Sequence, residues 1–189
     1  MKTKIIFILS FLLSLQISSA QKTDEQISWD AARPLTWKDF KGHADKSSPF
    51  DALTHGATMF KIANVSGKEY KFIITVDFDP KTSWVKANSE TDKLLAHEQC
   101  HFDLFEVYSR IFVKRLVEGK VLEGKNCIDK SSKIYKDTFG ELSKLQAKYD
   151  DETNHSKNEE KQKEWSDKIK KLLDDNKDFA KRELVFTMK

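Results

Sequence analysis

The stretch LLAHEQCHFDLFE, residues 94–106, carries two histidines four positions apart, with a glutamate directly after the first. A helix turns by about 100° per residue, so His97 and His101 share one face and their imidazoles can converge on one tetrahedral metal ion. Glu98 lies at the margin of that face, where its carboxylate can reach a metal-activated water without binding the metal. This order of residues predicts His97 and His101 as zinc ligands and Glu98 as the catalytic base.

The same stretch belongs to a long predicted helix. Apolar residues recur at helical spacing after Asn88, either Ser89 or Thr91 can cap the start, and Gly119 can end the helix. Several of these apolar residues lie within about 80° of His97 around the helix. They are Leu104, Phe105, Tyr108, Ile111 and Phe112. The metal face would then also be the buried face, which suits a catalytic metal. The alternative is a pair of buried histidines that bond to the backbone and hold no metal.

Strand-like sequence precedes this helix. Residues 51–65 and 69–80 are rich in apolar residues and flank Ser66-Gly67-Lys68, which predicts an antiparallel hairpin. Ser83-Trp84-Val85 suits a further short strand. At the other end of the chain, residues 183–189 suit either a short strand or a frayed helix end.

Two further helices are predicted after Gly119. An apolar stripe runs from Ile128 to Tyr149, and Ser156 with Glu159 resembles a capping box that would open a third helix carrying Trp165. We therefore expect an α+β fold in which a small antiparallel sheet precedes a helical half. No linker divides the chain, so residues 21–189 are predicted to form a single domain.

The N-terminus has the pattern of a secretory signal peptide. Lys2 and Lys4 precede an apolar run, and Ser18-Ser19-Ala20 supplies the small residues of a cleavage site after Ala20. A membrane anchor is the alternative, but the run is too short to span a bilayer comfortably. Removal of residues 1–20 lowers the net charge from +3 to +1. A chain so close to neutral shows no sign of nucleic-acid binding. We expect a secreted or periplasmic monomer with no stable membrane insertion after cleavage.

Export also bears on the two cysteines of the chain, Cys100 and Cys127. An oxidising compartment favours a disulfide between them. The alternative is that Cys100 binds the metal as a thiolate.

A catalytic zinc ion usually has three protein ligands and a water. Asp103 and Glu106 follow the histidines closely but point away from His97 by the 100° rule. A longer motif with a third histidine is absent, because Leu104 and Val107 stand at its glycine and histidine positions. Glu123 has the spacing of a zincin glutamate ligand but follows the expected helix end at Gly119.

Three histidines remain as candidates for the third ligand. His43 lies in a polar loop, and His55 lies in strand-like sequence where it can instead pack or bond. His155 lies in YDDETNHSKN, at the junction of two predicted helices that can hold its backbone in place. An exposed histidine in a polar turn is the alternative for His155.

The chain resembles a bacterial family of predicted secreted zinc-dependent proteases that is mostly described as a domain of unknown function. The resemblance rests on LLAHEQCHFDLFE, on YDDETNHS with the following Gln162 and Trp165, and on the upstream stretches LTWKDFKG and TSWVKAN. It covers roughly residues 29–175. It implies that the histidine after the Tyr-Asp-x-x-Thr pattern, here His155, is the third zinc ligand.

Together these observations predict a zincin-like metallopeptidase with one zinc ion per chain and a peptide or protein substrate. An extended peptide could lie along residues 83–85. Tyr149 could stabilise an oxyanion, although its place in the apolar stripe favours packing. The alternatives are a metal-dependent cell-wall amidase and a non-catalytic envelope protein with a structural zinc site. The structural site would need a fourth protein ligand, for which Asp150, Asp151 and Cys100 are candidates.

Overall fold

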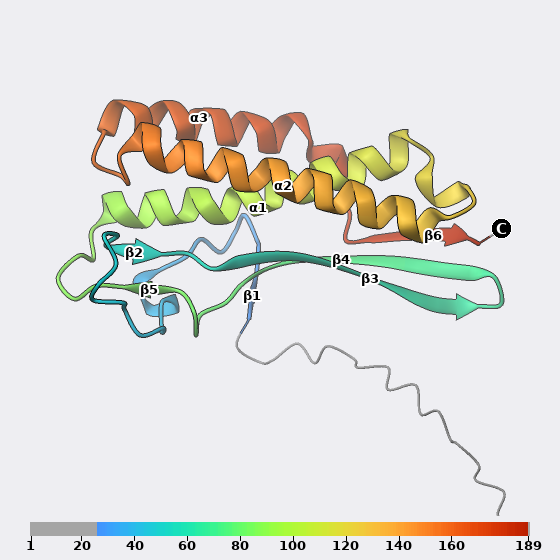
Figure 1. The fold of residues 1–189 in the computed structure, drawn as a ribbon, viewed down its shortest axis with the longest axis horizontal. Helices are drawn as coiled ribbons and strands as arrows, with labels where there is room; N and C mark the ends of the chain where they lie inside the picture. The colour runs from blue at the N-terminus through green and yellow to red at the C-terminus, as the bar shows by residue number, and fades with distance from the viewer. Residues whose placement is uncertain (1–25, 189) are drawn as a thin grey trace, which may run out of the picture.

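The computed structural model describes residues 26–188 and places an antiparallel sheet against three long helices (Figure 1). The strands are β1 (Ile27–Ser28), β2 (Ala52–Leu53), β3 (Gly56–Ser66), β4 (Glu69–Phe78), β5 (Trp84–Val85) and β6 (Glu183–Thr187). The helices are α1 (Asp92–Glu118), α2 (Cys127–Thr153) and α3 (Glu159–Asp175), with short 3-10 turns η1 (Trp37–Asp39), η2 (Val121–Glu123) and η3 (Lys177–Phe179). The expected signal peptide, residues 1–20, lies outside the described residues. Within the described part, no helix is long and apolar enough to cross a membrane.

The predicted hairpin is confirmed and forms the centre of the larger sheet. β3 and β4 pair in register from Gly56 opposite Phe78 to Ser66 opposite Glu69. Gly67 opens the turn with a φ of 54°, a left-handed conformation that glycine adopts without steric cost. The other edge of β4 pairs with both β1 and β6. The C-terminal segment is therefore a strand, and it returns to the sheet after the helices instead of ending the helical half.

The predicted strand at residues 83–85 is present as β5 in a separate two-stranded sheet. Its partner is β2, with Ala52 opposite Val85 and Leu53 opposite Trp84. The buried Ser83 joins this small sheet to the hairpin, because its hydroxyl accepts from the His55 amide and donates to the Asp79 carbonyl. Thr54, which follows β2, donates its hydroxyl to the Glu98 carbonyl at 3.3 Å and so holds β2 close to the N-terminal half of α1.

α1 is the central helix, and it lies between the sheet and the layer formed by α2 and α3 (Figure 1). Its boundaries agree with the prediction, because Thr91 accepts from the Leu94 amide at the start and Gly119 is the C-cap. Apolar side chains cover two of its sides. Phe112 packs with Phe72 of β4, whereas Leu104 packs with residues of α2 and α3. A helix buried on both sides holds its polar residues in fixed positions.

α2 and α3 form as predicted, but the cap of α3 differs. Asn158, not Ser156, is the N-cap, and its side chain accepts from the Lys161 amide. Ser156 has a φ of 72° and is the last of three consecutive left-handed residues, Asn154 to Ser156. An N-cap needs extended backbone, so Ser156 cannot take that role. α3 therefore begins two residues later than the capping-box pattern indicated.

The expected disulfide is not present, because Cys100 and Cys127 are free and buried in different clusters. The part of α1 from Cys100 to its end is roughly 27 Å long at about 1.5 Å per residue. Cys127 begins α2 beyond that end. A disulfide requires Cα atoms within about 7 Å of each other. The helix that carries Cys100 therefore keeps the two thiols apart.

Candidate metal centre

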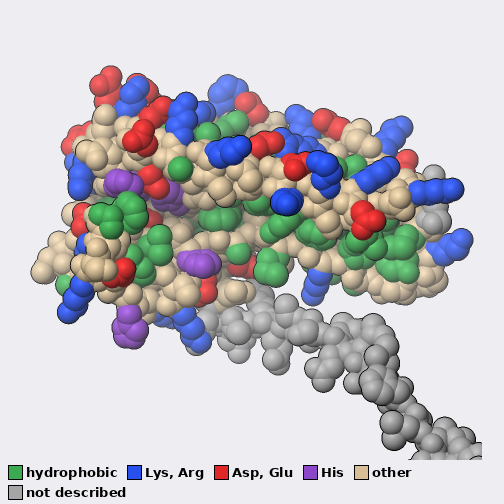
Figure 2. Space-filling view, viewed as in Figure 1, with side chains coloured by type: hydrophobic (Ala, Val, Ile, Leu, Met, Phe, Trp, Pro, Cys, Tyr) green, Lys and Arg blue, Asp and Glu red, His purple; other side chains and the backbone are tan. Residues whose placement is uncertain are grey.

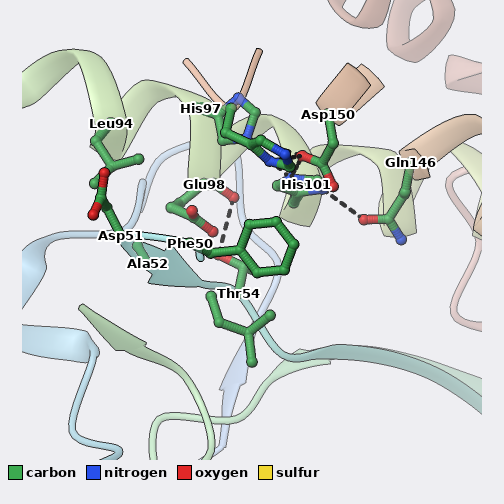
Figure 3. Close-up of a pocket in the computed structure, with 12 residues that line it drawn as sticks. Phe50, Asp51, Ala52, Thr54, Leu94, His97, Glu98, His101, Gln146 and Asp150 are labelled. Carbon is green, nitrogen blue, oxygen red and sulfur yellow. Dashed lines mark hydrogen bonds and ion pairs between the residues drawn. The ribbon is translucent and has the colours of Figure 1, made fainter. Parts of the chain in front are cut away.

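Three ligand-type atoms converge where α1 meets the C-terminal end of α2 (Figure 3). The Nε2 atoms of His97 and His101 lie 3.2 Å apart. Asp150 of α2 places its Oδ1 atom 3.1 Å from the first and 2.9 Å from the second. Donors at about 2.0–2.1 Å from a tetrahedral zinc ion lie about 3.3 Å from each other. These spacings fit a zinc-sized ion bound to all three atoms after a small outward shift.

The opposite nitrogens of the two rings are held by glutamine side chains. His97 donates from Nδ1 to Gln162 Oε1 at 3.0 Å, and His101 donates from Nδ1 to Gln146 Oε1 at 2.7 Å. These acceptors place the ring protons on Nδ1 and leave Nε2 to face the centre. Metal-binding histidines usually make this second bond, which fixes both the tautomer and the ring orientation.

A second network of contacts, made by Tyr149 and Gln162, supports His97. Tyr149 stacks on the His97 ring at a centroid distance of 4.6 Å and donates to the His97 carbonyl at 3.2 Å. Gln162 closes the loop by donating to the Tyr149 hydroxyl at 2.8 Å. Tyr149 is fully buried and does not line the cavity at the centre. Packing and orientation of His97 are therefore its role here, and the oxyanion role is not supported.

The centre is arranged for a positive charge. Burial raises the pKa of Asp150, but when the imidazoles of His101 and His97 are doubly protonated their Nε2–H groups donate to Asp150 and hold that pKa below its ordinary range. Burial lowers the pKa of His101, but the Asp150 hydrogen bond and the Glu98 carboxylate outweigh it and leave that pKa raised. A carboxylate that stays ionised beside two imidazoles is one of the donor sets found in catalytic zinc sites.

Glu98 lies beside the three converging atoms without joining them. Its side chain is buried, and its Oε2 atom has no hydrogen-bond partner among the described residues. Leaving a buried carboxylate oxygen unpaired costs free energy, so such an atom calls for a bound ligand or water. Glu98 lines a cavity of about 160 Å³ together with His97, His101 and Asp150. The cavity gives the carboxylate direct access to a molecule at the candidate metal centre.

His155 is at the same centre, as the sequence predicted. His97, Asp150 and His155 offer ligand atoms that all lie within 4.8 Å of one another, a group that could hold a metal. The His155 side chain is 39% exposed, its Nδ1 atom lies 3.6 Å from Asp150 Oδ1, and its ring packs on Phe50. His155 therefore stands at the mouth of the cavity, whereas Asp150 is central. Sequence reasoning considered Asp150 as a fourth ligand and placed His155 ahead of it as the third.

Asp103 and Glu106 point away from the centre, as the helical geometry predicted. Asp103 accepts from the Trp29 indole at 2.8 Å. Glu106 is fully buried and pairs with Arg110 at 2.8 Å and Arg182 at 2.7 Å. Both carboxylates are therefore occupied by structural contacts on the other side of α1.

The remaining candidates do not line the cavity. His43 and His55 are exposed, and Glu123 follows the far end of α1 in η2. Asp151 is exposed next to Asp150 and does not line the cavity either. Cys100 contacts Ser166 and Gln162, and burial raises the pKa of its thiol, so it is not placed as a thiolate ligand.

Asp150, Gln146 and Gln162 are the polar residues that sequence reasoning missed or undervalued. Gln146 and Asp150 are four positions apart, which places two polar side chains on one face of α2 beside its apolar stripe. That polar pair is the signal that could have indicated a second contributor to the centre.

No protein-family model, curated protein or solved structure matches the chain. The likeness to a family of secreted zinc-dependent proteases therefore stays a prediction.

Proposed function

We propose that the protein is a zinc-dependent peptidase with a zincin-like site. His97, His101 and Asp150 are the zinc ligands in this proposal, and one zinc ion binds per chain. The assignment is supported by the mutual spacing of their three donor atoms, 2.9 to 3.2 Å. The sequence-based assignment, with His155 as the third ligand, stays a prediction, and the two assignments differ in which variant loses zinc.

The unpaired Oε2 atom of Glu98 is the observation that carries the catalytic proposal. Bound zinc supplies Lewis acidity, which polarises an amide carbonyl and activates water. Glu98 takes a proton from the attacking water and returns it to the leaving amine. Its burial beside the candidate metal centre keeps the carboxylate close to both positions.

An extended peptide suits the rim of the cavity. The Asp51 carbonyl accepts from the Lys86 amide, so the main-chain groups of Asp51 point toward β5. Because these groups alternate along a strand, the main-chain groups of Ala52 point the opposite way. That edge of β2 borders the cavity, whereas β5 lies behind β2. Phe50 and Leu53 add exposed apolar surface at 39% and 41%. A peptide therefore adds to β2, in place of the segment 83–85 that the sequence indicated.

The proposal is tested by zinc content and peptide hydrolysis of the mature protein and its Glu98→Gln variant. Glutamine keeps the size of the side chain but cannot accept the proton, so zinc should stay at one per chain while hydrolysis falls by about 10² or more. Equal activity of the variant would remove Glu98 as the base. Loss of zinc from the variant would instead show that Glu98 is a ligand.

A structural zinc site is the second candidate, and the position of His155 favours it. If His155 joined the other three donors, four protein ligands would close the site to water. The substrates tested should therefore include both a broad peptide library and cell-wall peptides. The cell-wall peptides also test the alternative function as an amidase. A protein that holds zinc but cleaves none of them would have a structural site.

We also propose that the chain is exported and loses residues 1–20, which makes it secreted or periplasmic. The basic start, apolar run and small residues before Gln21 support this. Intact mass of the protein from the periplasm or culture fluid tests it, and a chain that keeps residues 1–20 would contradict it.

A further inference from the structure

A groove continues from the metal centre between β3 and α2. It has a volume of about 270 Å³, and Gln146, which bonds to His101, lines both the groove and the cavity at the centre. Figure 2 shows hydrophobic side chains along the strip between α2 and the β3–β4 hairpin. The two hollows are therefore neighbours, with Gln146 between them.

The floor of the groove belongs to the same helix as the metal ligands. Phe105 follows His101 by one helical turn, an advance of about 6 Å along α1. An extended peptide advances about 3.3 Å per residue. A substrate whose cleaved bond lies beside His101 at the metal centre would thus reach the groove within about two residues.

The lining of the groove is mostly apolar and contains no charged side chain. Its members are Gly56, Ala57, Thr58, Met59, Phe105, Tyr135, Phe139, Leu142, Ser143 and Gln146. The cavity at the centre differs, because acidic side chains line it. An apolar cavity of about 150 Å³ is large enough to hold a benzene ring. The groove can therefore take an aromatic or large aliphatic side chain, and it offers a charged one no partner.

Main-chain groups also face the groove along β3. The Tyr135 hydroxyl donates to the Thr58 carbonyl at 2.5 Å and closes the far end. The His55 carbonyl accepts from the Asp79 amide, so the main-chain groups of His55 point toward the chain that continues β4. The main-chain groups of Gly56 therefore point away from β4, toward the groove. A Cβ atom on Gly56 would lie 2.6 Å from the Phe105 ring, so only glycine lets that ring lie against the strand.

We propose that this groove is a specificity subsite for a bulky apolar side chain of the substrate, located within two residues of the cleaved bond. The inference rests on the proposed function, because it assigns the groove to the peptide held at the metal centre. Phe105, Phe139 and Leu142 contact the side chain, and the free edge of β3 bonds to the peptide backbone.

The test uses the zinc-loaded Glu98→Gln protein, in which peptides bind without turnover. The probes are blocked hexapeptides of alanine and serine that carry a single Phe, Leu, Ala or Asp, with affinity measured by calorimetry. Phe and Leu peptides should bind at least tenfold more tightly than Ala and Asp peptides. Equal affinity for all four would overturn the subsite.

The variant Ser143→Trp tests the groove directly. Ser143 is an exposed residue of α2 that lines the groove, and a tryptophan at this position would fill it. Lys144→Trp, on the next exposed position outside the groove, is the control. Ser143→Trp should reduce the Phe-to-Ala affinity ratio at least tenfold with zinc content unchanged, whereas Lys144→Trp should preserve the ratio. An equal effect of both variants would overturn the inference.

Failure of the subsite and failure of the peptidase proposal are distinguishable. Peptide hydrolysis by the wild-type protein without any preference for Phe or Leu would overturn the subsite and leave the peptidase. Selective binding that Ser143→Trp removes, without hydrolysis of any peptide by the wild type, would support the subsite and refute the peptidase.

Discussion

The Oδ1 atom of Asp150 lies 2.9 Å from the Nε2 atom of His101, although the two residues are 49 positions apart in the sequence. This contact joins the end of α2 to the third turn of α1. It turns a histidine pair, which alone has too few donors for a stable zinc site, into a three-donor centre.

Asp150→Ala should weaken zinc binding severely, because it removes the only anionic donor of the three. Zinc affinity should fall by a factor on the order of 10² or more, measured by competition with a chromogenic chelator. Asp151→Ala is the matched control, since Asp151 is the exposed neighbour outside the cavity. If His155→Ala loses zinc and Asp150→Ala retains it, His155 is the third ligand and the assignment of Asp150 is wrong.

The local sequence pattern predicted the residues that α1 contributes to this centre. His97, Glu98 and His101 are related by the turn of a single helix, which is a property of sequence spacing alone. Asp150 is brought to them by the packing of α2 on α1, where Leu142 and Tyr149 share a cluster with Leu104. The spacing of residues along the sequence does not predict that contact.

The same distinction explains the fold. The β3–β4 hairpin was predictable because Gly67 and its neighbours define a turn between two adjacent apolar runs. The return of β6 to β4 was not, because it depends on pairing between strands that are far apart in the sequence. The α3 cap was misplaced for a local reason, since Asn158 and Ser156 are both suitable caps and only backbone geometry separates them.

Gln146→Leu should lower zinc affinity by about 10- to 100-fold, because His101 Nδ1 then has no acceptor and the ring can turn. Gln146→Glu keeps an oxygen acceptor at the same place and should preserve most of the affinity. Chelator competition on both variants, with melting curves as a folding control, measures the effect. Equal affinity of Gln146→Leu and the wild type would mean that the His101 ring is oriented by other contacts.

Cys100 and Cys127 should remain thiols in the mature protein. Both are buried, so a thiol reagent should label neither in the folded state and both after denaturation without a reductant. Mass spectrometry counts the added labels. A denatured, unreduced protein that takes up no label would contain the disulfide after all, and α1 and α2 would then have to pack differently.

Glu106→Gln should destabilise the fold while leaving the zinc ligands in place. Glu106 is fully buried and neutralises both Arg110, on its own helix, and Arg182, which leads into β6. Removal of the Glu106 charge typically costs about 3 kcal/mol or more, because the Arg110 charge stays largely buried without its partner. Urea denaturation should show this loss, whereas Glu141→Gln, which breaks an exposed pair with Arg115, should cost well under about 1 kcal/mol. The folded fraction of Glu106→Gln should still bind one zinc ion. Loss of zinc without loss of stability would mean that Glu106 serves the metal centre, although it lies on the opposite side of α1.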